Sequence, residues 1–173
     1  MNNPFTLFNL PVDFQINNDL LSSRYLSLQK SLHPDNFAHS SPQEQRLAMQ
    51  KSAEVNDALQ ILKDPIRRAD AIIAIYTGEH KDLEQTHHHD MAFLMQQIEW
   101  RERLEEIENA KDVAQLMDFS IEVEKTKQQF LSEISTALSA QNWSQAAQIN
   151  DRLRFIKKLN IEIERVEDEI SEF

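Results

Sequence analysis

Residues 31–37 read Ser-Leu-His-Pro-Asp-Asn-Phe, and an amphipathic helix gives way to a polar loop within this stretch. Upstream, apolar side chains recur at helical spacing, which predicts a helix from about Asp19 to Leu32. Pro34 ends this helix, because proline has no N–H to donate and disfavours helical backbone in the residue before it. The stretch therefore marks a sharp helix stop.

A second helix is predicted to begin a few residues later. Ser41 can cap it, Pro42 suits its first position, and Glu44 follows at the third, which is a capping-box pattern. His33 and Asp35 therefore lie on a short, proline-stiffened connection between two helices. A single His-Pro-Asp tripeptide is a weak signal, and an ordinary helix stop would explain it as well.

Composition restricts the fold and the chemistry. The 173 residues include one Gly and no Cys. Hairpins and tight turns depend on Gly, and the abundance of Leu, Gln, Glu, Lys and Ala favours an all-α fold. No stretch approaches the ~18 consecutive apolar residues that a membrane span needs. A chain without Cys cannot form disulfides or thiolate metal sites and is typical of a reducing cytoplasm.

The net charge of −11 is concentrated in the second half of the chain. Residues 1–77 hold 7 Lys and Arg against 8 Asp and Glu, whereas residues 78–173 hold 11 against 21. Nucleic-acid binding requires a basic surface, and so does attraction to anionic membranes. We therefore expect neither of these partners, and a protein partner is favoured.

The first 78 residues are predicted to form one helical domain. A short helix or turn at 4–12 should direct Phe5, Phe8 and Leu10 inward. A further helix is predicted to begin after Asp64, its N-cap, with Pro65 at the first position, and to end at Gly78, its C-cap. Core candidates of the helix at 41–62 are Leu47, Met49, Ala53, Val55, Ala58, Leu59 and Leu62.

Residues 79–90 are polar and aperiodic, which predicts a linker. Three long helical patterns follow, at about 90–109, 111–139 and 144–171, with Ser144 as the expected cap of the last. Apolar residues of the last helix alternate mostly three and four apart, as in the seam of a bundle. Residues 91–173 are therefore predicted to be a three-helix bundle with short connections.

The helix over 91–108 carries two apolar groups. At 100° per residue, its core stripe falls within about 60° and contains Phe93, Trp100, Leu104 and Ile107. A second group lies about 100–200° from Phe93 and contains Met91, Leu94, Met95 and Ile98. This second face either packs on the N-terminal domain or binds a partner. Phe155, at the margin of the last helix's seam, either extends such a surface or is buried.

The arrangement of the first 65 residues resembles the J-domain of the DnaJ family. The resemblance rests on a short apolar N-terminal segment, a helix with basic residues, the His-Pro-Asp loop and a long Ala-rich helix. J-domains dock on DnaK-type ATPase chaperones. The resemblance assigns the chaperone-binding role to His33, Pro34 and Asp35, with Arg24 and Lys30 adding positive charge.

The second half is similar to the C-terminal domain of the bacterial HscB family of iron–sulfur co-chaperones. The similarity lies in residues 90–112, 152–159 and 168–173, and with the J-domain pattern it covers essentially the whole chain. It implies an L-shaped, cytoplasmic co-chaperone that stimulates ATP hydrolysis by the chaperone HscA and delivers the scaffold protein IscU. The implied scaffold-binding residues are Leu94, Met95, Ile98, Glu99, Arg101, Glu102, Glu106 and Phe155.

Two positions depart from the family pattern. J-domains usually carry Lys after the tripeptide, but this chain has Asn36, which removes one positive charge. Ile98 stands where bacterial relatives carry Leu, which conserves volume. Some eukaryotic relatives add an N-terminal Cys-pair metal module, and this chain has no Cys.

Two other functions are compatible with parts of the sequence. A metal-dependent enzyme could use His87, His88, His89 and Asp90, but adjacent residues do not all point at one ion. A J-protein that serves a general DnaK chaperone with a different client shares the same tripeptide. We expect a protein that is not itself an enzyme and needs no metal or cofactor.

Overall fold

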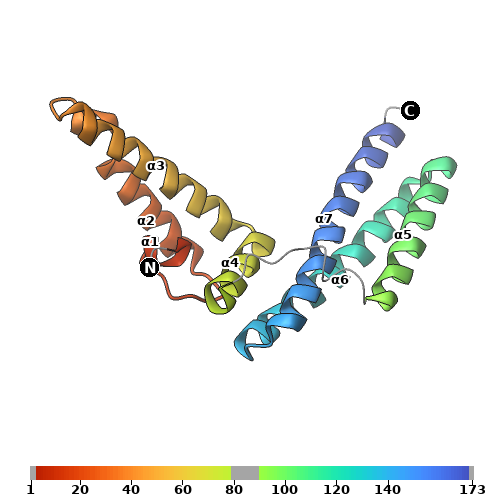
Figure 1. The fold of residues 1–173 in the computed structure, drawn as a ribbon. Coiled ribbons are helices and arrows are strands. Elements are labelled where there is room, and N and C mark those ends of the chain that lie inside the picture. The colour runs from red at the N-terminus through yellow and green to blue at the C-terminus, as the bar shows by residue number, and fades with distance from the viewer. Residues whose placement is uncertain (1–2, 79–89, 172–173) are drawn as a thin grey trace. The chain divides into compact units, whose positions relative to one another are not determined.

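The chain folds as two helical units. The computed structural model describes residues 3–78 and 90–171 (Figure 1), and the chain divides into Met1–Glu79 and His80–Phe173. The described residues contain no strand, so the predicted all-α class is confirmed. None of the helices in these ranges is long and apolar enough to cross a membrane.

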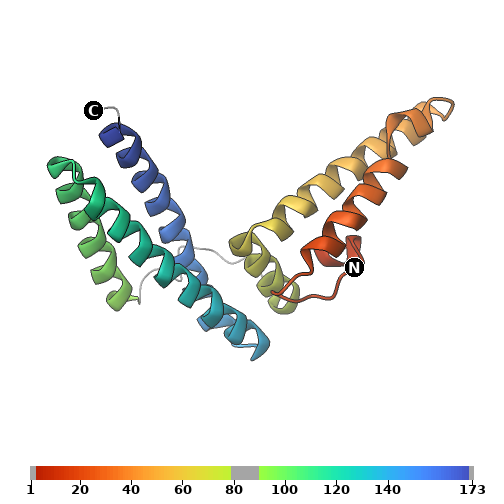
Figure 2. The same cartoon turned by 180° about the vertical axis from the view of Figure 1, so that it is seen from behind.

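The first unit is built on a helical hairpin. Its elements are α1 Pro4–Leu7, α2 Asn18–Ser31, the 3₁₀ helix η1 Pro34–Phe37, α3 Pro42–Lys63 and α4 Pro65–Thr77. Helices α2 and α3 lie side by side and run in opposite directions in the views of Figures 1 and 2. The connection between them, expected as a loop, contains η1, because Pro34 has a backbone angle suited to the first helical position.

Local caps determine where these helices begin and end. Side-chain oxygens of Asn17, Ser41 and Asp64 each accept a backbone N–H from the first turn of the following helix. Gly78 ends α4 with a φ of 72°, which is left-handed backbone that Gly adopts without a Cβ clash. The predicted caps at Ser41, Asp64 and Gly78 are confirmed.

The core of the first unit includes three N-terminal residues, and the prediction for them is confirmed. Phe5, Phe8 and Leu10 are buried. On α3 the prediction is partly wrong. Val55, Ala58, Leu59 and Leu62 are buried, whereas Leu47, Met49 and Ala53 are exposed. On a helical wheel the three exposed residues lie about 80–160° from Val55 and so face away from the core.

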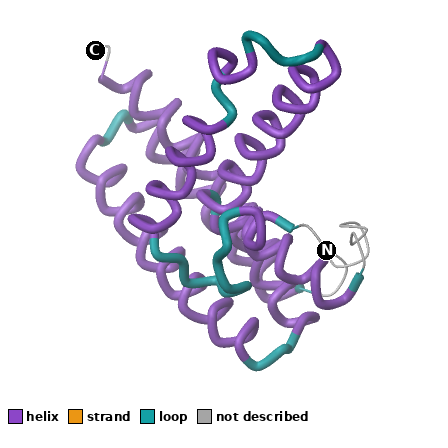
Figure 3. The backbone as a smooth tube through the Cα atoms, turned by 90° about the vertical axis from the view of Figure 1, so that its left-hand side faces the viewer, coloured by secondary structure: helices purple, strands orange, loops and turns teal. Residues whose placement is uncertain are grey.

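The second unit is a bundle of three helices, α5 Met91–Ala110, α6 Val113–Ser139 and α7 Trp143–Ser171, in which α6 runs opposite to both neighbours (Figures 1 and 2). Figure 3 draws the described residues as helices joined by loops. The apolar residues of α7 that follow the predicted spacing of three and four are all buried: Ile149, Leu153, Ile156, Leu159, Ile163, Val166 and Ile170. Of the predicted linker, residues 79–89 lie outside the described residues, and Asp90 is the N-cap of α5.

The predicted cap of α7 is wrong. The helix begins at Trp143, one residue before the predicted Ser144. Asn142 Oδ1 accepts a hydrogen bond from the backbone N–H of Gln145 at 3.3 Å, and the Asn142 side-chain amide donates to Gln145 Oε1 at 2.9 Å. Asn and Ser are about equally good N-caps, so the sequence alone did not show whether Asn142 or Ser144 caps the helix.

Candidate functional site

The His-Pro-Asp turn follows the end of α2. Pro34 opens η1, and His33 is its N-cap. The Nδ1 atom of His33 accepts a hydrogen bond from the backbone N–H of Asp35 at 3.2 Å. A neutral imidazole that accepts at Nδ1 carries its hydrogen on Nε2. His33 therefore caps its own turn with one nitrogen and offers the other as a donor.

The side chains of His33 and Asp35 both reach solvent. The side chain of His33 is 60% exposed and that of Asp35 is 92% exposed, with Asp35 Oδ2 lying 3.5 Å from His33 Nδ1. A carboxylate as exposed as this one can accept both N–H groups of an arginine fork. The geometry suits recognition of a cationic partner group.

Asn36 holds the turn against the end of α2. Its side-chain amide donates to the backbone oxygens of Lys30 at 2.7 Å and Ser31 at 3.3 Å. These carbonyls belong to the last turn of α2, which has no helical donors left for them. Its own backbone N–H donates to the carbonyl of His33 at 2.9 Å. At the position where J-domains usually carry Lys, this chain therefore has a side chain that joins the turn to α2.

Further side chains that the sequence did not single out hold the turn and the hairpin. Gln45 of α3 donates to the carbonyl of Phe37 at 2.9 Å. Asn56 of α3 accepts hydrogen bonds from Tyr25 at 2.8 Å and Gln29 at 2.7 Å on α2. These contacts join residues up to 31 positions apart, and helical periodicity carries no signal for them.

The two cations assigned to the chaperone-binding surface differ in their surroundings. Lys30 is exposed in the last turn of α2, where a helix favours positive charge. Arg24 is half-buried, and its guanidinium donates to the carbonyl of Phe8 at 2.9 Å and to that of Asn9. Arg24 therefore ties α2 to the end of α1 in addition to carrying charge.

Helix α5 presents the second apolar face predicted for it. Its core-stripe residues Phe93, Trp100, Leu104 and Ile107 are buried. Those of the other face are exposed: Met91 by 65%, Leu94 by 44%, Met95 by 65% and Ile98 by 46%. We call these four residues the α5 patch. Glu99, Arg101 and Glu102 are also exposed on this helix. The surface combines apolar residues with a charged border, as partner-binding surfaces do.

Three of the predicted scaffold-binding residues lie outside the α5 patch. Glu106 borders a small hollow toward α6, together with Arg103 and Asp118. Arg101 and Phe155 line a groove between α5 and α7. Phe155 is only 9% exposed, and the guanidinium of Arg101 lies 5.3 Å from the centre of its ring.

Phe155 also positions α5 from within the bundle. Its ring stacks on Trp100 with centroids 6.3 Å apart and meets Phe93 edge-on at 5.6 Å. Offset and edge-to-face pairs of this kind are favourable beyond the burial of area. Replacing Phe155 would therefore change the orientation of α5 as well as any surface that Phe155 provides.

The start of α5 is held by an ion pair to α7. Asp90 accepts hydrogen bonds from Arg152 at 2.8 and 2.9 Å, and the Arg152 guanidinium lies 5.4 Å from the rings of Phe93 and Phe130. Burial alone would raise the pKa of Asp90, but the hydrogen bonds and charge of Arg152 outweigh it, so the pKa lies below its usual value. This carboxylate is engaged by Arg152. The other members of the metal-site hypothesis, His87–His89, lie outside the described residues.

Comparison with known proteins supports one family. A family model described as HSCB C-terminal oligomerisation domain matches residues 89–164. A co-chaperone protein HscB homolog of Mannheimia succiniciproducens is 66% identical over the whole of both chains, and one of Pasteurella multocida is 63% identical over 99% of each. The solved structure of the chaperone HscB from Vibrio cholerae is 38% identical, with a TM-score of 0.85 over 98% of this chain and 99% of that one.

The helical hairpin and its exposed His-Pro-Asp turn form a J-domain, and the protein is a J-domain co-chaperone. The chain belongs to the HscB co-chaperone family.

Proposed function

We propose that this protein stimulates ATP hydrolysis by the specialised DnaK-type chaperone HscA and delivers the iron–sulfur scaffold IscU to it. In this proposal the first unit, residues 1–78, contacts the chaperone and the bundle at 91–173 binds the scaffold. The proposal assigns the activity to the reducing bacterial cytoplasm, which a chain without Cys suits. The reaction belongs to the chaperone, whose hydrolysis-competent state the turn favours.

The chaperone contact would be made by His33, Pro34 and Asp35, with Lys30 and Arg24 adding charge. Asp35 would accept a two-pronged hydrogen bond from an arginine of the ATPase. The Nε2–H of His33 would donate across the interface, and Pro34 would keep the two groups in register. The observation that carries the proposal is the exposure of His33 and Asp35 on a turn that Asn36 and Gln45 tie to both helices.

The scaffold contact would centre on the α5 patch. Leu94, Met95 and Ile98 supply apolar area, and a few such anchors carry most of the energy of an interface. Glu99, Glu102 and Glu106 with Arg101 would form its charged border, and Phe155 would hold α5 in place from α7 through Phe93 and Trp100. Two Met residues in the α5 patch favour a surface that adapts to its partner.

Single-turnover ATP hydrolysis by HscA tests both halves, with this protein and IscU added separately and together. We expect synergistic stimulation that is lost in His33→Gln, while circular dichroism shows the helical fold intact. The matched control is His39→Gln, which alters an exposed histidine outside the tripeptide. Full stimulation by His33→Gln would remove the turn from the mechanism.

The alternative of a general DnaK chaperone with a different client is decided by the same assay. Stimulation that is indifferent to IscU would keep the J-domain role and reject this client. For the scaffold contact, calorimetry should show weaker binding by Leu94→Ser, and unaltered affinity would contradict the role of the α5 patch.

A further inference from the structure

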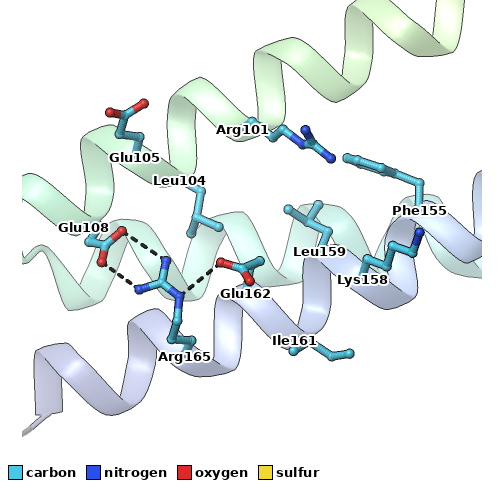
Figure 4. A pocket seen from close by; sticks show the side chains of 10 residues that line it. All are labelled: Arg101, Leu104, Glu105, Glu108, Phe155, Lys158, Leu159, Ile161, Glu162 and Arg165. Atoms are coloured by element: carbon cyan, nitrogen blue, oxygen red, sulfur yellow. Dashed lines mark hydrogen bonds and ion pairs between the residues drawn. The ribbon is translucent and has the colours of Figure 1, made fainter.

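A groove runs between α5 and α7 on the bundle. Its volume is about 670 Å³, and its lining residues come from these two helices (Figure 4). Leu104, Phe155 and Leu159 are buried side chains that form its apolar floor, and Ile161, 58% exposed, lines it as well. The groove thus combines apolar side chains from both helices with a solvent-accessible isoleucine.

The groove is long rather than round. Phe155 lies near one end and Arg165 near the other (Figure 4), and ten residues of helix cover roughly 15 Å. That length corresponds to about four or five residues of extended chain. A segment of polypeptide fits this shape better than a single side chain does.

The two ends differ in charge. Arg101 and Lys158 line the end that contains Phe155. Among the described residues, neither of these cations has a carboxylate within the 4.0 Å of an ion pair, and Arg101 instead lies over the Phe155 ring. This end can therefore receive an anionic group from outside the chain.

The other end is acidic. Arg165 binds Glu108 at 2.9 Å, Glu162 at 3.0 Å and Glu169 at 3.0 Å, so that three carboxylates surround one guanidinium. The hydrogen bonds from Arg165 lower the pKa of Glu108, and those to Glu108 raise the pKa of Arg165, so this pair favours its charged form. The cluster retains a surplus of negative charge that favours a cation beside it.

We propose that this groove binds an apolar segment of the scaffold partner, with a carboxylate of that segment between Arg101 and Lys158 and a basic residue beside the Glu108–Arg165 cluster. The proposal rests on the proposed function, because Arg101 and Phe155 belong to the surface assigned there to the scaffold. It extends that surface along α7 beyond Phe155 and gives the bound segment a direction. Lys158 and Ile161 become contact residues.

Calorimetric titration of the full-length protein with IscU tests the proposal. We expect Lys158→Glu to weaken binding about fivefold, and by more at low salt, because an exposed pair becomes a like-charge contact. Ile161→Ser should weaken binding without disturbing the fold, since that side chain is already exposed. Lys125→Glu on α6 is the matched control, with the same change in net charge at an exposed position outside the groove lining.

Leu94→Ser separates this proposal from the proposed function. Loss of affinity in Leu94→Ser, with wild-type affinity in both Lys158→Glu and Ile161→Ser, would overturn the groove and leave the α5 patch standing. Wild-type affinity in all three variants, or no binding by the unaltered protein, would reject the scaffold-binding surface and the groove together. Equal weakening by Lys158→Glu and Lys125→Glu would show a general charge effect and also overturn the groove.

Discussion

The ion pair between Asp90 and Arg152 is the polar contact whose loss we expect to destabilise the second unit most. Replacing Asp90 by Asn keeps a capping side chain of the same size at the start of α5 but removes the negative charge. The Arg152 guanidinium then stays between Phe93 and Phe130 without its carboxylate. The perturbation therefore isolates the ion pair from the cap.

The expected cost follows from burial. Breaking a fully buried ion pair costs about 3–5 kcal/mol, whereas an exposed pair contributes about 0–1 kcal/mol. The Asp90 side chain is 16% exposed and that of Arg152 is 25% exposed, so the pair lies between these limits. We expect Asp90→Asn to lower the free energy of unfolding by about 2 kcal/mol.

Urea denaturation followed by tryptophan fluorescence measures this cost in the relevant unit. The two tryptophans of the chain, Trp100 and Trp143, both belong to the second unit, so the signal reports its unfolding. Glu122→Gln serves as the matched control, because it removes the charge from the more exposed pair that Arg103 makes with Glu122. The control should cost less than about 0.5 kcal/mol.

The pH dependence has a definite sign. The folded-state pKa of Asp90 lies below its ordinary value of about 3.9, so the pair stabilises the fold fully above that pH. The contribution is lost as the pH falls through the lowered folded-state pKa. The stability gap between the wild type and Asp90→Asn should therefore narrow below about pH 4. A gap below about 0.5 kcal/mol at pH 7, the value expected of an exposed pair, would refute the reasoning. A gap that widens in acid would refute it as well.

Three further predictions concern separate parts of the chain. Asn36→Asp keeps the size of the side chain but removes the amide donor. It should lower maximal ATPase stimulation by up to about fivefold, with the circular-dichroism spectrum unchanged. Full stimulation would show that the link to α2 is dispensable. Gln141 has a φ of 59°, so Gln141→Gly should stabilise the second unit by about 1 kcal/mol in urea denaturation, and destabilisation would contradict the strain. Ile134 is 0% exposed, so Ile134→Val should lower the free energy of unfolding by about 1 kcal/mol. Ile121 is 53% exposed, so Ile121→Val should change it very little. Equal losses of stability in the two variants would contradict this burial pattern.

Helix positions and ends followed largely from local sequence. Ser41 before Pro42 and Gly78 after α4 act through hydrogen bonds or backbone angles within a few residues, so the sequence alone predicts them. The two faces of α5 were likewise predicted, because a periodicity of 3.6 residues separates them on any helix. The cap of α7 was misplaced since Asn142 and Ser144 both have capping side chains.

The partners of the polar side chains depended on tertiary structure. Asp90 and Arg152 are 62 positions apart, and nothing in either local pattern indicates that the two meet. The sequence likewise did not show that Arg24 bonds the end of α1, or that Arg101 and Lys158 line one end of a groove. Periodicity specifies which face of a helix is apolar. Packing decides which helix lies against that face, and therefore which charges meet across it.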